Sequence, residues 1–327
     1  MLRIHFSGTD LGRVRVASQP DVMWEMVLSL HQLVRPHAFF APWNRLARKA
    51  LTEAEIGQDV HLLATLAPNS SYFPDFLTPS GHITVLGSGI DKVMSTGRQR
   101  LRAEIGRLVD SRLHPPSWLD DIGAGRPRAL RRLGNALHRY HATVMAPYAS
   151  DAAERAGHEA ARFARRALDQ GSEALLSSLG PSARWRPPKL EVDYPVTRHL
   201  RLDGRGLLLI PSHFCHDHPI ALADPELPPV LIYPVARGPL WIPSTAELEP
   251  GGRGLDELIG PTRAAALRSL DTAHSTTALA TLLCTSAATA SRHAAALRRA
   301  GLVITERAGS CVLHTRTTLG TSLVHGR

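Results

Sequence analysis

Residues 286–303 read SAATASRHAAALRRAGLV, and this stretch contains both the start and the end of one helix. Ser286 is a suitable N-cap, because its hydroxyl can accept a hydrogen bond from an amide of the first helical turn. Gly301 can take the positive φ with which many helices end. The stretch therefore predicts a helix from residue 287 to residue 300, followed by a strand that begins near Leu302.

The residues before this helix predict two further helices. Pro261 favours the first turn of a helix whose apolar side chains can face a core. A shorter helix over 276–283 begins with Ser275 or Thr276 as its cap. A tight connection at 284–286 then leads into the helix over 287–300, which predicts a helix-turn-helix.

The residues after the helix predict a hairpin. Two β-rich runs, 302–307 and 311–316, flank Ala308-Gly309-Ser310, which places a glycine at the tip of the turn. A helix-turn-helix followed by a hairpin is the order of elements in a winged helix-turn-helix. We therefore expect residues 258–327 to form such a domain.

A domain of this kind inserts its second helix into the major groove of DNA. Thr289, Ser291 and Arg292 supply short or forked donors near the N-terminal end of that helix, where base edges are reached. The amides capped by Ser286 can face a phosphate, and His293 can point either to DNA or into the packing of the domain. The predicted DNA-binding residues are Ser286, Thr289, Ser291, Arg292, His293, the backbone-contacting Arg298 and Arg299, and Arg307 and Arg316 on the hairpin.

The distribution of charge agrees with a polyanionic partner. The 327-residue chain has a formal net charge of +9. Residues 259–327 contain two acidic residues, Asp271 and Glu306, against eight arginines, so +6 of the excess lies in about a fifth of the chain. A solvated basic surface is the plain alternative, but here the charge coincides with helix-turn-helix punctuation and a glycine-tipped hairpin.

The same stretch resembles the recognition helix of ArsR-type winged-helix regulators, which commonly read S-x-x-T-V-S-x-H-L followed by L-x-x-A-G-L-V. The matching positions are Ser286, Thr289, Ser291, His293, Leu297, Ala300, Gly301, Leu302 and Val303. The resemblance implies a DNA-binding transcriptional regulator that acts as a homodimer. Two modules are also what half-sites about one helical turn apart require.

The sequence departs from the family pattern at four positions. Cys284 stands where the turn usually has glycine, Thr285 and Ala290 where the pattern has valine, and Ala294 where it has leucine. A non-glycine residue is strained if the turn needs a positive φ. The metal-sensing members carry Cys-x-Cys where this chain has Ser275-Thr276-Thr277, so we expect no thiolate metal sensing there.

Residues 1–245 predict a separate, mostly helical region of unknown role. Helices are expected over 90–113, 127–145 and 152–179, and a small β-meander among the runs 190–194, 206–211 and 229–235. A proline- and glycine-rich linker is expected at 246–257. The predicted fold class of the chain is α+β. Phe73-Pro74-Asp75-Phe76-Leu77, Leu190–Pro195 and Leu222–Pro229 also resemble an uncharacterised domain found ahead of winged helices in actinobacterial regulators.

This region can bind a small-molecule effector or set the dimer. Its aromatic residues have two interpretations, the lining of a pocket or, for most of them, ordinary core. They are Trp24, Trp43, Tyr72, Phe73 and Phe76.

Other classes of protein find little support. The chain has no run of 18 apolar residues, no signal-peptide core and three widely spaced cysteines, so we expect a cytoplasmic protein with reduced thiols. It has no Walker sequence and no Gly-x-Ser-x-Gly elbow, and we expect neither an enzyme nor a cofactor.

Two alternatives remain open beside the regulator. The first is a protein-interaction module that keeps the winged-helix shape, which the substitutions at Cys284, Thr285 and Ala294 would fit. The second is a metal-binding sensor or enzyme built on His213, Cys215, His216 and His218. Alternation along a strand would turn these four ligands to opposite faces, so we expect no metal.

Overall fold

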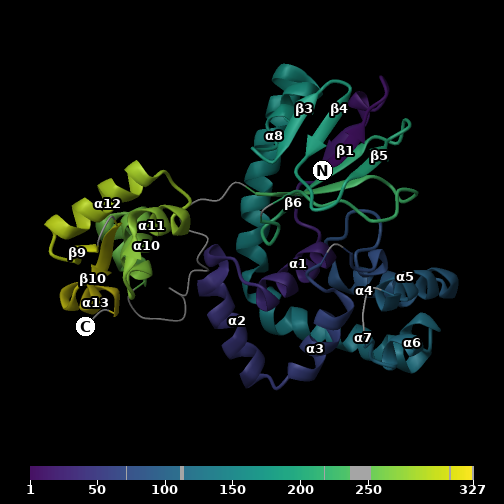
Figure 1. The fold of residues 1–327 in the computed structure, drawn as a ribbon, viewed down its shortest axis with the longest axis horizontal. Helices are drawn as coiled ribbons and strands as arrows, with labels where there is room; N and C mark the ends of the chain where they lie inside the picture. Colours follow the sequence, from purple (N-terminus) through teal and green to yellow (C-terminus); the bar gives the residue numbers. More distant parts are fainter. Residues whose placement is uncertain (71, 111–113, 217, 236–251, 309–310, 326–327) are drawn as a thin grey trace. The chain divides into compact units, whose positions relative to one another are not determined.

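The computed structural model describes residues 1–70, 72–110, 114–216, 218–235, 252–308 and 311–325 (Figure 1). The chain divides into two units. The first comprises Met1–Pro36 and Leu46–Val235, and the second comprises His37–Arg45 and Ala236–Arg327.

The N-terminal part of the chain is rich in helices, as the sequence predicts. Its α-helices are α1 (Val22–Val34), α2 (Ala41–Glu53), α3 (Gly57–Leu66), α4 (Leu86–Met94), α5 (Arg98–Asp110), α6 (Trp118–Gly123), α7 (Pro127–Tyr140) and α8 (Ala149–Ser177). Short 3-10 turns lie at Leu11–Arg13, Ala38–Phe40, Asp75–Leu77 and Ala146–Tyr148.

All three of the long expected helices are interrupted. The one expected over 152–179 is α8, which is broken by a kink at Gly171, where φ is +84°. The helix expected over 90–113 is in fact α4 and α5, because the chain leaves the helix at Ser95 and re-enters it after Gly97. The helix expected over 127–145 ends as an α-helix at Tyr140 and continues as a π-helical turn, His141–Met145. Local periodicity alone does not show such breaks, since the apolar spacing on both sides is similar.

The strands of the first unit form two sheets. One has the order β3 (Ala183–Arg186), β4 (Lys189–Val192), β1 (Leu2–His5) and β5 (Arg198–Arg201), with β1 antiparallel to β4 and parallel to β5. The other has the order β2 (Val14–Val16), β6 (Leu207–Ser212) and β7 (Val230–Pro234), and its strands are all parallel.

This pairing corrects the expected β-meander. The run 190–194 contains β4, which belongs to the four-stranded sheet, whereas the runs 206–211 and 229–235 contain β6 and β7 of the other sheet. β6 and β7 are neighbours but pair in parallel, so the three runs form no meander. The α+β class is as expected. The strand partners differ because alternation tells which side chains a strand buries and not which strand lies next to it.

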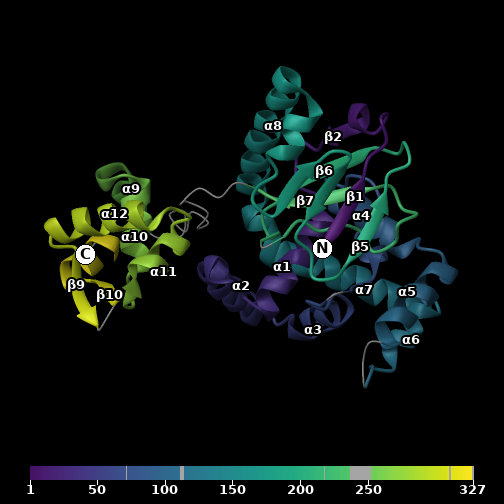
Figure 2. The same ribbon diagram turned by 45° about the horizontal axis from the view of Figure 1, so that its top comes forward.

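The two sheets and α8 share one apolar core. Leu2, Ile4, Leu190 and Val192 of the four-stranded sheet are fully buried, together with Leu209 and Leu231 of the parallel sheet and Leu176 near the end of α8. Figure 2 shows the strands of both sheets beside α8. The four-stranded sheet therefore turns one face to this core and the other face outward.

Buried carboxyl groups join segments that are distant in sequence. Asp75 accepts hydrogen bonds from the backbone amides of Ala223 and Asp224, at 2.9 and 2.7 Å. This contact brings together two of the three segments that carry the resemblance of the N-terminal region. Glu25 of α1 similarly accepts from the amide of His213, at 3.1 Å, directly after β6.

The second unit contains a winged helix-turn-helix. Its elements are α9 (Gly252–Ile259), α10 (Pro261–Ser269), β8 (His274–Ser275), α11 (Thr276–Leu282), α12 (Ala287–Arg299), β9 (Val303–Ala308), β10 (Cys311–Arg316) and α13 (Thr318–His325). The strand order is β8-β10-β9, so β8 adds to the β9–β10 hairpin and β10 is the central strand. Three helices followed by this hairpin are the elements that residues 258–327 predict (Figure 1).

Two features at the ends of this unit were not expected. The helix α9 covers the last part of the linker expected at 246–257, and its Leu255 is buried in the core of the domain. The remainder of that linker, and the expected domain end at residue 245, lie outside the described residues. A further helix, α13, packs Leu323 and Val324 against the same core.

No helix among the described residues combines the length and the apolar character needed to cross a bilayer.

The buried Glu25 predicts how stability depends on pH. Burial raises the pKa of this carboxyl from 4.5 to about 8. Between pH 4.5 and pH 8 the carboxyl is therefore protonated in the folded chain and ionised in the unfolded chain. Its contribution to stability is complete below pH 4.5 and is lost as the pH rises through 8. The free energy of unfolding is expected to fall by about 1.4 kcal/mol for each unit by which the two pKa values differ. Glu25→Gln removes the titrating group, so we expect this decrease to be smaller in the variant.

Urea unfolding of the full-length chain over a pH series would measure this effect. Tryptophan fluorescence is a suitable signal, because Trp24 precedes Glu25 on α1 and is 1% exposed. Parallel pH profiles for the wild type and the Glu25→Gln variant would contradict the prediction.

Candidate nucleic-acid interface

Burial of one face of α12 determines which of its residues are presented to solvent. Ala290, Ala294 and Leu297 are buried in the core formed with α10 and α11. Their spacing of four and three residues defines one side of the helix. Ser291 and Arg292 lie on the other side and are exposed, as are the first residues of the helix, Ala287 and Ala288.

The N-terminal end of α12 carries a chain of side-chain hydrogen bonds. The Ser286 hydroxyl accepts from the Thr289 amide at 3.2 Å and donates to the Thr289 hydroxyl at 3.0 Å. The Thr289 hydroxyl also accepts from Nη2 of Arg292 at 3.0 Å. The cap predicted at Ser286 is therefore present, and it holds the Arg292 guanidinium toward the N-terminal end of the helix.

His293 lies at the edge of the buried face and is half-buried. Burial lowers its pKa, and the positive charges of Arg263 and Arg292 lower it further. Both effects favour the uncharged imidazole. Of the two interpretations of this residue, packing at the junction with α10 and contact with DNA, the half-buried position fits the first better.

The two arginines at the end of α12 are exposed on different sides of the helix. Arg299 follows Arg292 by seven residues, so it lies on the same side two turns later. Arg298 is close enough to His314 to lower the pKa of that imidazole, although burial lowers it more. Both arginines also interact favourably with the C-terminal end of the helix dipole.

The hairpin places its two predicted arginines in different surroundings. Arg307 is exposed on β9, opposite Val312 of β10 and near the tip. Arg316 pairs with Val303 at the other end of the hairpin, and its guanidinium donates to the Thr321 hydroxyl at 3.2 Å and to the Leu267 carbonyl at 3.4 Å. Arg316 thus joins α10, β10 and α13. The tip residues 309 and 310 lie outside the described residues.

Sequence reasoning missed a buried histidine that connects the wing to the helices. His314 of β10 is 5% exposed. Its Nε2 lies 2.9 Å from the Thr276 hydroxyl of α11, and its Nδ1 lies 3.0 Å from the Thr305 hydroxyl of β9. Strand alternation could have placed this side chain inward, but neither threonine is near it in sequence.

The turn between α11 and α12 has a strained backbone at the position where the ArsR-type pattern has glycine. Cys284 has a φ of +50°. Its amide donates to the Thr281 carbonyl at 3.1 Å, and the Thr285 amide donates to the Ala280 carbonyl at 2.9 Å. These bonds hold the turn in a conformation that glycine adopts more easily.

The histidine- and cysteine-rich segment is engaged in local contacts. Nε2 of His213 lies 2.7 Å from the Ala152 carbonyl, and the Cys215 thiol donates to the His218 carbonyl at 3.2 Å. Among the described residues, no three histidine, cysteine, aspartate or glutamate side chains form a group that could hold a metal ion. Residue 217 lies outside that description.

The aromatic residues considered as a pocket lining mostly form core. Trp24, Trp43 and Phe76 are almost fully buried. Phe73 is half-buried and packs its ring edge-on against Trp24, while the Tyr72 hydroxyl donates to the Glu104 carbonyl at 3.2 Å. The interpretation of these residues as core is confirmed for the three buried ones.

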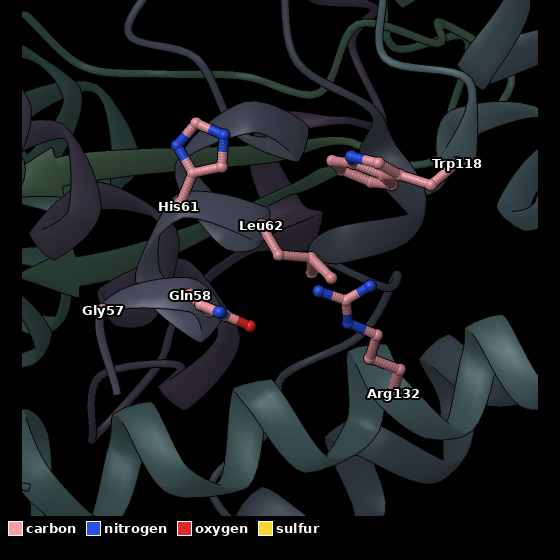
Figure 3. Close-up of a pocket in the computed structure, with 6 residues that line it drawn as sticks. All are labelled: Gly57, Gln58, His61, Leu62, Trp118 and Arg132. Atoms are coloured by element: carbon pink, nitrogen blue, oxygen red, sulfur yellow. The ribbon is translucent and has the colours of Figure 1, made fainter. Parts of the chain in front are cut away.

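A pocket lies elsewhere in the first unit. It has a volume of about 290 Å³ and is lined by Gly57, Gln58, His61 and Leu62 of α3, Trp118 of α6 and Arg132 of α7. Figure 3 shows the Trp118 ring and the Arg132 guanidinium facing the Leu62 side chain. The pocket therefore combines an aromatic surface with a cationic donor.

Comparisons of the chain with family models, with curated proteins and with solved structures found no match.

The strained turn leads to a prediction about stability. We expect Cys284→Gly to stabilise the winged helix relative to Cys284→Ala by about 1 kcal/mol, because only glycine takes a left-handed conformation at little cost. Hydrogen exchange of the α12 amides in the full-length chain would measure the difference. Equal protection in the two variants would contradict the prediction.

Proposed function

We propose that the protein is a DNA-binding transcriptional regulator of the ArsR type. The observation that carries the proposal is the outer face of α12, where the capped N-terminus, Ser291 and Arg292 are exposed on a helix whose other face is buried. A helix in this position of a winged helix-turn-helix enters the major groove, and its first turns reach base edges. Arginine can then donate two hydrogen bonds to guanine.

The charge of the domain supports the same proposal. Arg268 forms an ion pair with Asp256 at 2.8 Å, and Arg316 is hydrogen-bonded within the domain. Among the described residues, five other arginines of the domain have no carboxylate within ion-pair distance: Arg263, Arg292, Arg298, Arg299 and Arg307. Unneutralised arginines of this kind favour a phosphate-bearing partner.

We further propose that the regulator acts as a homodimer in the cytoplasm, has no enzymatic activity and responds to a small molecule. Two copies would place two α12 helices on half-sites about one helical turn apart. The protein-interaction module is the alternative. The buried Ala294 weakens that alternative, because alanine at this position is accommodated in the core of the domain.

The decisive experiment is a binding titration of the full-length protein with DNA from upstream of its own gene and the neighbouring genes, against a random duplex. Preference for one fragment supports a sequence-specific regulator. Equal, steeply salt-dependent binding to all fragments would mean that the domain binds DNA only through its positive charge, without sequence preference. Absence of binding favours the protein-interaction module.

Arg292 and Arg299 offer a matched comparison on the same side of α12. Arg292→Ala is expected to weaken binding to the preferred fragment by about 1–3 kcal/mol, with a smaller loss on random DNA, because a base contact is removed. Arg299→Ala is expected to weaken both by similar factors, since a phosphate contact is not specific. Equal losses on both duplexes for Arg292→Ala would make it a phosphate contact.

We place the small-molecule site at the pocket formed by α3, α6 and α7. Among the described residues, the Arg132 guanidinium has no hydrogen-bond or ion-pair partner, while Trp118 and Leu62 offer an apolar surface. A planar ligand with a carboxylate would satisfy both, because the guanidinium can bind a carboxylate through two parallel hydrogen bonds.

Benzoate and benzamide would test the pocket, since they differ in charge but little in shape. Benzoate is expected to quench the fluorescence of Trp118, and Arg132→Ala is expected to weaken its binding at least tenfold, because about 1.5–3 kcal/mol is lost with a charge-assisted hydrogen bond. Benzamide binding should be unaffected by the substitution. Equal affinities of the wild type and the Arg132→Ala variant for benzoate would exclude this site for carboxylates.

A further inference from the structure

The outward face of the four-stranded sheet is strongly basic. Because side chains alternate along each strand, the strand residues next to the core-facing Leu2, Ile4, Trp185, Leu190 and Leu200 lie on this face. They are Arg184, Arg186, Lys189, Glu191, Arg3, His5, His199 and Arg201. Five of the eight are cationic and one is anionic. We call this set the basic sheet face.

The strand register arranges these residues in two rows that cross all four strands. One row runs Arg186, Lys189, His5, Arg201 and contains no acidic residue. The other runs Arg184, Glu191, Arg3, His199. Residues directly opposite each other on one face of a sheet have their side chains about 5 Å apart. The first row therefore holds three cations and an imidazole within the width of the sheet.

Such an arrangement costs stability when nothing anionic covers it, because like charges directly opposite each other repel. Glu191 relieves part of the repulsion, with Arg3 at 3.7 Å and Arg186 at 3.6 Å. Lys189 and Arg201 form no ion pair with any described residue. His5 and His199 hydrogen-bond to each other across the strands, Nε2 to Nδ1 at 2.9 Å, and thereby keep both rings on this face.

The dimensions of the face suit a polymer of uniform negative charge. Four strands at a spacing of about 4.8 Å make the row about 14 Å long. A DNA strand carries one phosphate for about every 3.4 Å of helix axis, so an axial length equal to this row contains about four phosphates of one strand. A folded acidic protein would present carboxylates mixed with cations, which matches an unmixed row less well.

We propose that the basic sheet face is a second DNA-binding surface, which contacts the phosphate backbone without reading sequence. This inference builds on the proposed function, since the ligand is the same duplex, but it concerns residues of the first unit that α12 does not include. The sheet would supply affinity and the winged helix would supply specificity.

A charge-matched pair of triple variants tests the proposal in the full-length protein. The test variant is Arg186→Ala/Lys189→Ala/Arg201→Ala, and the control is Arg128→Ala/Arg131→Ala/Arg165→Ala, whose three arginines are equally exposed in the same unit. Both variants lose three positive charges. Each is titrated with a random duplex and with the preferred upstream fragment between about 50 and 200 mM salt.

The test variant is expected to bind both duplexes at least tenfold more weakly than the control at the lowest salt. The slope of log affinity against log salt should fall by about two to three, because about 0.9 is lost for each phosphate contact removed. The ratio of the two affinities, which measures sequence preference, should not change. Thermal unfolding should show that the test variant is at least as stable as the wild type, since repulsion on the sheet is relieved.

Equal affinities and equal salt slopes for the two triple variants would overturn the proposal. That result would leave the face to another anionic partner, such as an acidic protein. Arg292→Ala separates this outcome from failure of the proposed function. If Arg292→Ala leaves sequence preference intact while the test variant weakens all binding, the sheet contacts DNA and the proposed role of α12 is wrong.

Discussion

The burial of one side of α12 is the constraint on which the candidate interface depends. Ala290 and Ala294 let this helix approach α10 and α11 closely, and Leu297 anchors its second half in the same core. Because a helix has a fixed period, burying these positions places Ser291 and Arg292 on the exposed side of the helix. The cap at Ser286 then sets where the helix begins and, through Thr289, where the Arg292 guanidinium lies. The packing of this apolar side thereby determines which polar side chains of α12 are exposed to solvent.

Within the winged helix, polar side chains connect the hairpin to the helices. His314 joins β10 to the start of α11 and to β9, and Arg316 joins β10 to α10 and α13. A buried polar side chain is stabilising only when its hydrogen-bonding groups are satisfied. The buried His314 meets that condition at both ring nitrogens. Its partners belong to α11 and β9, so the position of the wing is coupled to the position of the helices.

The first unit uses a different means to hold distant segments together. β1 lies between β4 and β5, so the first residues of the chain complete a sheet formed mostly by residues 183–201. Asp75 and Glu25 then fix loops through backbone amides. Pairing a strand at the very start of the chain gives the sheet one apolar face and one basic face, and the basic residues of β1 come to lie beside those of β4 and β5.

The sequence by itself determined most local features of the winged helix. Ser286, Pro261 and Gly301 act through their own backbone or through neighbours within four residues, so the limits of α10 and α12 follow from local rules. The positive φ at Cys284 was anticipated for the same reason, from the glycine that the family pattern has there. The α+β class followed from composition and periodicity along the chain.

Only the tertiary structure decided which segments meet. The basic sheet face requires β1, β3, β4 and β5 to pair in one register, and β1 is separated from the others by about half of the chain. The sequence does not show that Arg316 contacts Leu267 of α10 and Thr321 of α13. The pocket combines residues of α3, α6 and α7 in the same way. Alternation and capping are local signals, whereas the partner of a strand or a guanidinium depends on packing between distant segments.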